Sequence, residues 1–111
     1  MKKLLPCLLV ITFAFSASAS AMTGKEVYEK TCVTCHGDDG KGKVPGAANF
    51  TDPNGRLTKS DKDLLKHIIN GYQTPGSPMA MPARGGNPAL TNDELSDALK
   101  YIRDTFEAKK K

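Results

Sequence analysis

The sequence predicts a small all-α domain in which a few helices are joined by long loops. Three segments have the apolar spacing of an amphipathic helix and begin at a residue that can cap it: 24–35, 60–70 and 92–106. No run has the character of a β-strand. The 111 residues include ten glycines and seven prolines, so we expect one loop-rich domain.

The first 21 residues have the pattern of a secretory signal peptide. Lys2 and Lys3 precede an apolar run over 4–15, and small residues fill 16–21. Ala19-Ser20-Ala21 fits an A-x-A cleavage site and predicts a mature domain of 22–111, with cleavage after Ala19 as the second choice. An uncleaved membrane anchor is the alternative, but the apolar run is shorter than the ~20 residues that span a bilayer. We therefore expect a periplasmic protein without stable membrane insertion.

Capping signals mark the ends of the predicted helices. Thr23 with Glu26 and Thr91 with Glu94 form capping boxes at the starts of the first and last helices. Gly71 ends the middle helix. Gly24 lowers helix propensity where it stands, so we expect it to serve close packing of the first helix against the last.

The run Cys32-Val33-Thr34-Cys35-His36 carries the most specific chemistry in the chain. Two cysteines followed directly by a histidine in this spacing form the attachment motif for c-type haem. One turn of helix brings both sulfurs to one face, where each can add to a haem vinyl group. His36 can then bind the iron as the proximal ligand. A secretory signal agrees with this interpretation, because haem is attached to such proteins outside the cytoplasm.

Other interpretations of the two cysteines are weaker. A zinc site needs about four ligands, and only Cys7 and His67 remain to complete one. A thioredoxin-like dithiol belongs in a βαβ pattern, which is absent here. A disulfide between Cys32 and Cys35 would close a very small loop and stabilise little.

The remaining candidate ligands for haem iron lie in the segment 71–87 and in the middle helix. The segment 71–87, in which we expect no helix or strand, contains Met79 and Met81, and a thioether suits haem iron opposite a histidine. We prefer Met81, because Pro82 stiffens the backbone beside it. Both methionines could instead be plain loop residues. His67 is a further candidate ligand, but we interpret it as a partly exposed helix residue.

The glycine-rich loop over 37–49 lies directly after the haem motif. It lacks the G-K-[ST] ending and the preceding strand of a phosphate-binding loop. Haem-ligating histidines usually donate their second ring N–H to an acceptor, and the carbonyl of Pro45 is our candidate. We expect Phe50 to be a core aromatic residue.

The sequence resembles the class I c-type cytochromes from Thr23 to about Phe106. The motifs that carry the resemblance are the CxxCH run, Gly24 with Tyr28, Pro45, Ile69-Asn70-Gly71, Met81-Pro82-Ala83-Arg84-Gly85-Gly86, and Leu99-Lys100-Tyr101-Ile102. The resemblance implies three to five helices wrapped around one covalently bound haem, with the terminal helices crossing. The doublet Met79-Ala80-Met81 departs from the pattern of a single methionine.

The resemblance also implies the roles of individual residues. Cys32 and Cys35 would hold one haem c by thioether bonds, His36 and Met81 would ligate the iron, and Pro45 would orient His36. The protein would then be a non-enzymatic periplasmic carrier of single electrons. The alternatives are a haem-based sensor or redox enzyme subunit with a labile distal ligand, and a non-haem dithiol or metal-binding module.

Charge excludes one class of partner. The formal net charge of +4 falls to +2 when Lys2 and Lys3 leave with the signal peptide. So small a net positive charge is not typical of a nucleic-acid-binding protein. We expect a monomer that meets protein redox partners transiently, with Lys41, Lys43 and Arg84 as candidate cations around the haem edge.

Overall fold

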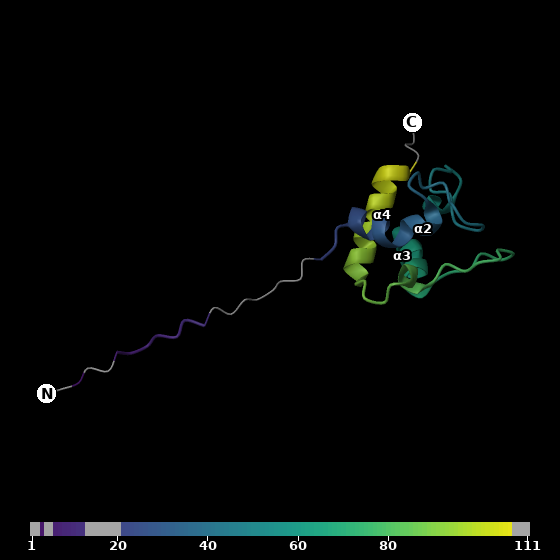
Figure 1. Ribbon diagram of the computed structural model, residues 1–111. Helices are drawn as coiled ribbons and strands as arrows, with labels where there is room; N and C mark the ends of the chain where they lie inside the picture. Colours follow the sequence, from purple (N-terminus) through teal and green to yellow (C-terminus); the bar gives the residue numbers. More distant parts are fainter. Residues whose placement is uncertain (1–2, 4–5, 13–20, 108–111) are drawn as a thin grey trace.

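The computed structural model describes residues 3, 6–12 and 21–107 (Figure 1). Most of the predicted leader therefore lies outside the described residues. Within 6–12 the four apolar side chains from Leu8 to Ile11 are 67–85% exposed, so this part of the leader adds nothing to the core. None of the described helices is long and apolar enough to cross a bilayer.

The first predicted helix is one continuous helical segment of three parts. It consists of α1 (Gly24–Val27), the π-helical turn η1 (Tyr28–Cys32) and α2 (Val33–His36). The predicted capping box of Thr23 and Glu26 is present. The π turn, where the Val33 amide donates to the Tyr28 carbonyl, was not predicted. A π turn inserts one extra residue, so the CxxCH turn is rotated by about 100° relative to a regular helix.

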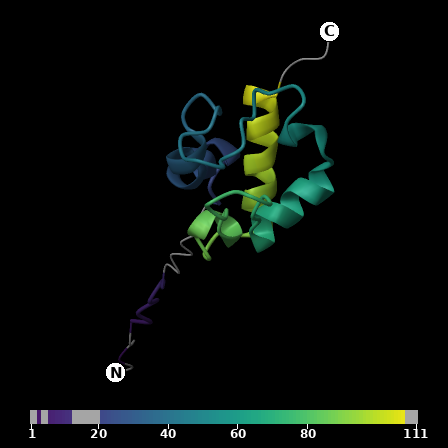
Figure 2. The same ribbon diagram turned by 90° about the vertical axis from the view of Figure 1, so that its right-hand side faces the viewer.

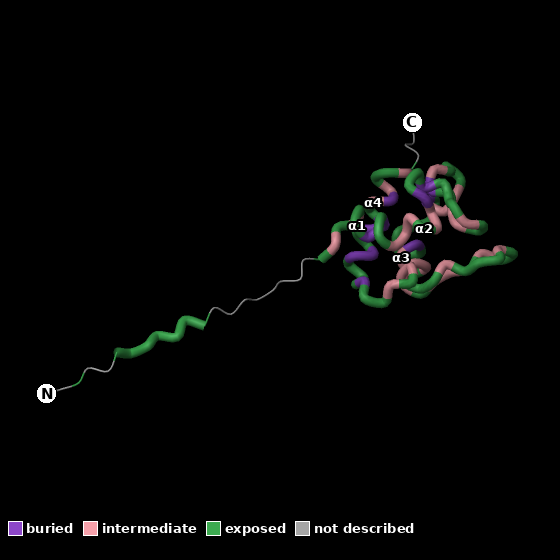
Figure 3. The backbone as a smooth tube through the Cα atoms, in the orientation of Figure 1, coloured by how far each residue is buried: buried purple, intermediate pink, exposed green. Residues whose placement is uncertain are grey.

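The first helical segment crosses the last helix, α4 (Asn92–Phe106), as predicted. The crossing is close at Gly24, where an added Cβ would overlap the backbone of Asp97 and Ala98. The capping box of Thr91 and Glu94 is present at the start of α4. Buried residues follow this crossing along α1 and α4 (Figure 3).

The middle helix, α3 (Asp61–Asn70), packs on the other side of α4 (Figure 2). Ser60 caps it and Gly71, at φ 81°, ends it, as predicted. Buried side chains form two clusters along α4. The first holds Tyr28, Phe50, Leu57, Leu64, Leu99 and Ile102, and the second holds Val27, Leu90, Leu95 and Ala98.

The loops contain short elements that the sequence analysis did not predict. A 3₁₀ turn, η2 (Arg56–Thr58), precedes α3, and another, η3 (Ala83–Gly86), precedes α4. Tyr72 and Met81 form an antiparallel β-bridge. The expectation that 71–87 has neither helix nor strand character was therefore wrong. Apart from this bridge, the described residues contain no strand, which agrees with the predicted all-α class.

Candidate functional site

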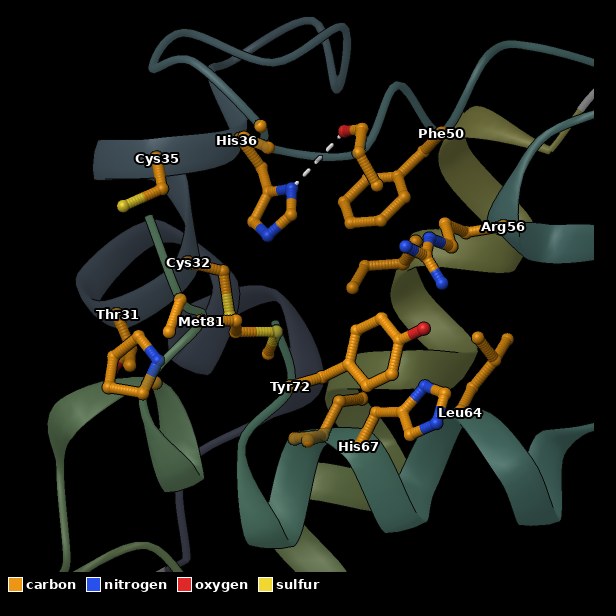
Figure 4. Close-up of a pocket in the computed structure, with 18 of the residues that line it drawn as sticks. Thr31, Cys32, Cys35, His36, Phe50, Arg56, Leu64, His67, Tyr72 and Met81 are labelled. Carbon is orange, nitrogen blue, oxygen red and sulfur yellow. Dashed lines mark hydrogen bonds between the residues drawn. The ribbon is translucent and has the colours of Figure 1, made fainter. Parts of the chain in front are cut away.

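A hollow lies between α2, α3, α4 and the segment from Tyr72 to Gly85 (Figure 4). Its walls are mainly apolar side chains of the core and of the two long loops. All five sequence-predicted site residues line it: Cys32, Cys35, His36, Pro45 and Met81. Residues almost 50 positions apart in the chain thus share one space.

The two cysteines of the motif lie half-buried at one wall, and both are free thiols. Burial, together with the neighbouring Cys35, raises the pKa of the Cys32 thiol to about 11. A nucleophilic redox dithiol needs the opposite shift, because the thiolate is the reactive form. The raised pKa of Cys32 therefore disfavours dithiol exchange chemistry at this residue.

His36 presents one ring nitrogen to the protein and the other to the hollow (Figure 4). Its Nδ1 lies 3.3 Å from the carbonyl oxygen of Ala48. A carbonyl can only accept, so Nδ1 carries the proton and Nε2 keeps its lone pair. Burial lowers the pKa of His36 despite this hydrogen bond, which favours the neutral form that binds metals.

The acceptor for His36 corrects the sequence prediction, which was Pro45. Pro45 lines the hollow, but the loop folds back so that the carbonyl three residues later meets Nδ1. The Phe50 ring stacks on the imidazole with 4.5 Å between the centroids. The loop therefore fixes both the tautomer and the tilt of the ring, the role that was expected of Pro45 alone.

Met81 is anchored more firmly than Met79. The Met81 amide donates to the Tyr72 carbonyl at 2.7 Å, and the Tyr72 amide donates to the Met81 carbonyl at 3.0 Å. Met79 is 49% exposed, and its amide meets only the hydroxyl of Ser77, at 3.4 Å. Both methionines border the hollow, and Figure 4 shows the Met81 sulfur lying inside it.

Sequence reasoning missed a stack of polar side chains across the hollow from the cysteines. The centroids of the Tyr72 and His67 rings lie 4.0 Å apart. The Arg56 guanidinium lies over the Tyr72 ring, 4.7 Å from the ring centroid. Arg56 also donates to the hydroxyl of Thr74. His67 is half-buried in this stack, which agrees with the interpretation of a partly exposed helix residue. No local pattern signals the stack, because its members come from three separate elements.

Arg84 is not the free surface cation that the sequence analysis considered. It has a left-handed backbone, with φ 55°, and its guanidinium donates to the Leu90 carbonyl and to Asn92 Oδ1, both at 2.8 Å. Its side chain therefore ties η3 to the start of α4. Lys41 and Lys43 are exposed, as the steering hypothesis requires.

Comparison with known proteins decides the family. The family model for cytochrome c matches residues 21–106 of this chain. The chain belongs to the cytochrome c family. Cytochrome c-555 of Chlorobaculum tepidum is 36% identical over 97 residues, which cover 86% of this chain and 83% of that protein. Cytochrome c-555 of Prosthecochloris aestuarii is 35% identical over 81 residues, covering 71% of this chain and 81% of that protein.

A more distant relative is a component of a larger assembly. Subunit CcoP of the cbb3-type cytochrome c oxidase of Rhodobacter capsulatus is 29% identical over 85 residues, which cover 76% of this chain but 29% of that subunit. The more similar relatives are named as cytochromes rather than enzymes. This cytochrome c is accordingly an electron-transfer protein and not an enzyme.

The hollow fits the covalently bound haem c that the family implies. It offers two adjacent thiols, a neutral imidazole with its lone pair directed inward, and apolar walls. The predicted cofactor is thus supported by the chemistry of the donor set as well as by the family.

Proposed function

We propose that this cytochrome c is a periplasmic carrier of single electrons. Cys32 and Cys35 would hold its haem by thioether bonds, and His36 and Met81 would ligate the iron. The observation that carries the proposal is the double hydrogen bond between Met81 and Tyr72, because it fixes a thioether in the same hollow as the His36 imidazole.

Each residue of the site has a separable role in electron transfer. When bound, haem c supplies a one-electron couple between Fe(II) and Fe(III). The Ala48 carbonyl holds the His36 tautomer, and the bridge to Tyr72 presents the Met81 sulfur without a further loss of loop entropy. A soft thioether and apolar walls stabilise the reduced state, which raises the reduction potential above that of a bis-histidine site.

The location and the partners follow from the leader and from the filled axial positions. Removal of residues 1–21 releases the domain of 22–111 into the periplasm, where haem attachment occurs. If His36 and Met81 both ligate the iron of a bound haem, they would leave no place on it for a substrate. Electrons then pass through small, transient contacts with donor and acceptor proteins. We expect the carrier to act as a monomer.

Spectroscopy of matched methionine variants tests the axial ligand. The oxidised wild-type protein should show the weak near-infrared band of ferric haem ligated by sulfur. Met81→Leu should abolish that band and keep the Soret band, and Met79→Leu should leave both unchanged. Loss of the band in Met79→Leu alone would transfer the distal role to Met79. Absence of the band from the wild type would refute His/Met ligation.

A second candidate is a sensor or enzyme subunit with a labile distal ligand, which the likeness to an oxidase subunit favours. Carbon monoxide distinguishes the two functions, since it binds only where an axial position opens. The reduced wild-type carrier should give no carbon monoxide spectrum at neutral pH, and Met81→Leu should give one. Ready binding by the wild type would favour the sensor or subunit.

A further inference from the structure

Met22 lies at the start of the packed domain. Ala21 is exposed, whereas Met22 is half-buried and its side chain joins the core cluster around Val27 and Leu95. Met22 directly precedes the helix cap Thr23, and Val27 is the fourth residue of that helix. A contact between these two positions is a hydrophobic staple, which fixes the direction in which the chain enters the helix.

The backbone nitrogen of Met22 also meets a buried carboxylate of α4. It donates to Glu94 Oε2 at 3.0 Å, across 72 residues of sequence. The other oxygen of Glu94 accepts the Thr91 amide at 3.0 Å, as part of the capping box. Glu94 is 9% exposed, and the amides of Thr91 and Met22 lower the pKa of its carboxyl. One ionised carboxylate thus joins the starts of the two crossing helices.

We propose that removal of the leader after Ala21 converts this hydrogen bond into an ion pair between the new α-ammonium group of Met22 and the carboxylate of Glu94. The inference rests on the leader cleavage in the proposed function. Hydrolysis of the Ala21–Met22 peptide bond leaves the carboxylate on the leader and the amine on Met22. That amine takes a proton at neutral pH and needs no movement to reach its partner.

Whether the ion pair forms depends on which peptide bond is cleaved. Cleavage after Ala19 would leave Ser20 and Ala21 ahead of Met22, whose nitrogen would stay a neutral amide. The hydrogen bond would survive, but no charge would face Glu94. The bond from an amide is already strengthened by the charge of its acceptor, and an ammonium donor adds the attraction between two opposite charges. Processing after Ala21 therefore tightens the helix crossing that carries the CxxCH turn.

The cleavage site is tested first, by the intact mass of the haem protein exported with its own leader. We expect the mass of a haem-bearing chain whose first residue is Met22. The mass of a chain whose first residue is Ser20 would overturn the inference without affecting the haem site or the electron-carrier function. A protein that keeps its leader overturns both the inference and the proposed processing.

The ion pair is tested with two haem proteins made behind a foreign leader whose cleavage is defined. One begins at Met22 and the other at Ser20. Each is made in two versions, one with the wild-type Glu94 and one with the substitution Glu94→Gln. Thermal unfolding should show that Glu94→Gln lowers the melting temperature more in the form that begins at Met22 than in the form that begins at Ser20. Glutamine keeps the shape of the capping box, so both variants can fold.

Asp93→Asn is the matched control, because Asp93 lies exposed in the same first turn of α4. Asp93→Asn should change the melting temperature by the same amount in the form that begins at Met22 and in the form that begins at Ser20. Equal losses for Glu94→Gln in the two forms would show that Glu94 acts as a cap alone and would overturn the ion pair. A larger loss in the form that begins at Ser20 would overturn it too.

Discussion

The phenol of Tyr28 donates a 2.6 Å hydrogen bond to the carbonyl of Gly37, the residue directly after His36 of the CxxCH run. Tyr28 opens the π turn and is only 2% exposed, and its ring packs against those of Tyr101 and Phe106. The bond spans the CxxCH turn and ties its far end to the core. The turn that presents His36 is therefore supported from both ends.

Tyr28→Phe should destabilise the haem protein by about 1 kcal/mol, because the Gly37 carbonyl loses the short bond from the phenol and keeps only the 3.3 Å bond from the Gly40 amide. Chemical denaturation of the holoprotein measures the loss. Tyr101→Phe is the control, since Tyr101 is only partly buried and flanks the same aromatic cluster. A loss no larger than that of the control would mean that the Gly40 amide satisfies the Gly37 carbonyl by itself.

The same phenol predicts a dependence of stability on alkaline pH. Burial, aided by neighbouring ionisable groups, raises the pKa of Tyr28 above its usual value of ~10. The folded protein thus holds this proton more tightly than the unfolded chain does. The contribution of Tyr28 is complete below pH ~10 and is lost as the pH rises toward the folded pKa. The stability difference between wild type and Tyr28→Phe should shrink above pH ~10, and a constant difference would contradict this.

Gly24→Ala should destabilise the protein by about 1–3 kcal/mol through overpacking, because the added Cβ overlaps the backbone of Asp97 and Ala98. Urea denaturation of the holoprotein measures the effect. Lys25→Ala is the matched control, since that side chain is 65% exposed on the same turn. Alanine is the better helix former, so a stabilised Gly24→Ala would show that the crossing is looser than the structure has it.

Arg103→Leu should cost more stability than other charge removals on α4. Its guanidinium donates to the carbonyls of Leu57 and Lys59 at 2.8 and 2.7 Å, and it pairs with Asp61. Leucine keeps the apolar stem but leaves two carbonyls without a donor, a loss of about 2 kcal/mol in thermal unfolding. Lys100→Leu, which breaks an exposed pair with Asp104, should change stability much less than Arg103→Leu.

Arg84→Gly should be less harmful than Arg84→Ala. Both remove the hydrogen bonds to Leu90 and Asn92, but only glycine tolerates the left-handed backbone at φ 55° without strain. The difference should be about 1 kcal/mol in favour of glycine, measured by denaturation of the two holoproteins. If alanine is the more stable variant, the left-handed conformation is not kept once the guanidinium is lost.

Local signals in the sequence predicted the secondary structure well. The two capping boxes, the Ser60 cap and the stop at Gly71 all lie where they were expected, because each depends on residues within one helical turn. Gly24 predicted the helix crossing for a similar reason, since only a missing side chain permits so close an approach. The CxxCH spacing likewise predicted the haem site of the family.

The sequence alone thus determined where the helices begin and end, and which residues are chemically able to hold a haem. Only the tertiary structure decided that Ala48 rather than Pro45 meets His36, that Tyr72 anchors Met81, and that Arg84 is a structural tie. Each of these depends on how a glycine- or proline-rich loop returns to the core. Such returns join residues far apart in the chain, and no local periodicity encodes them.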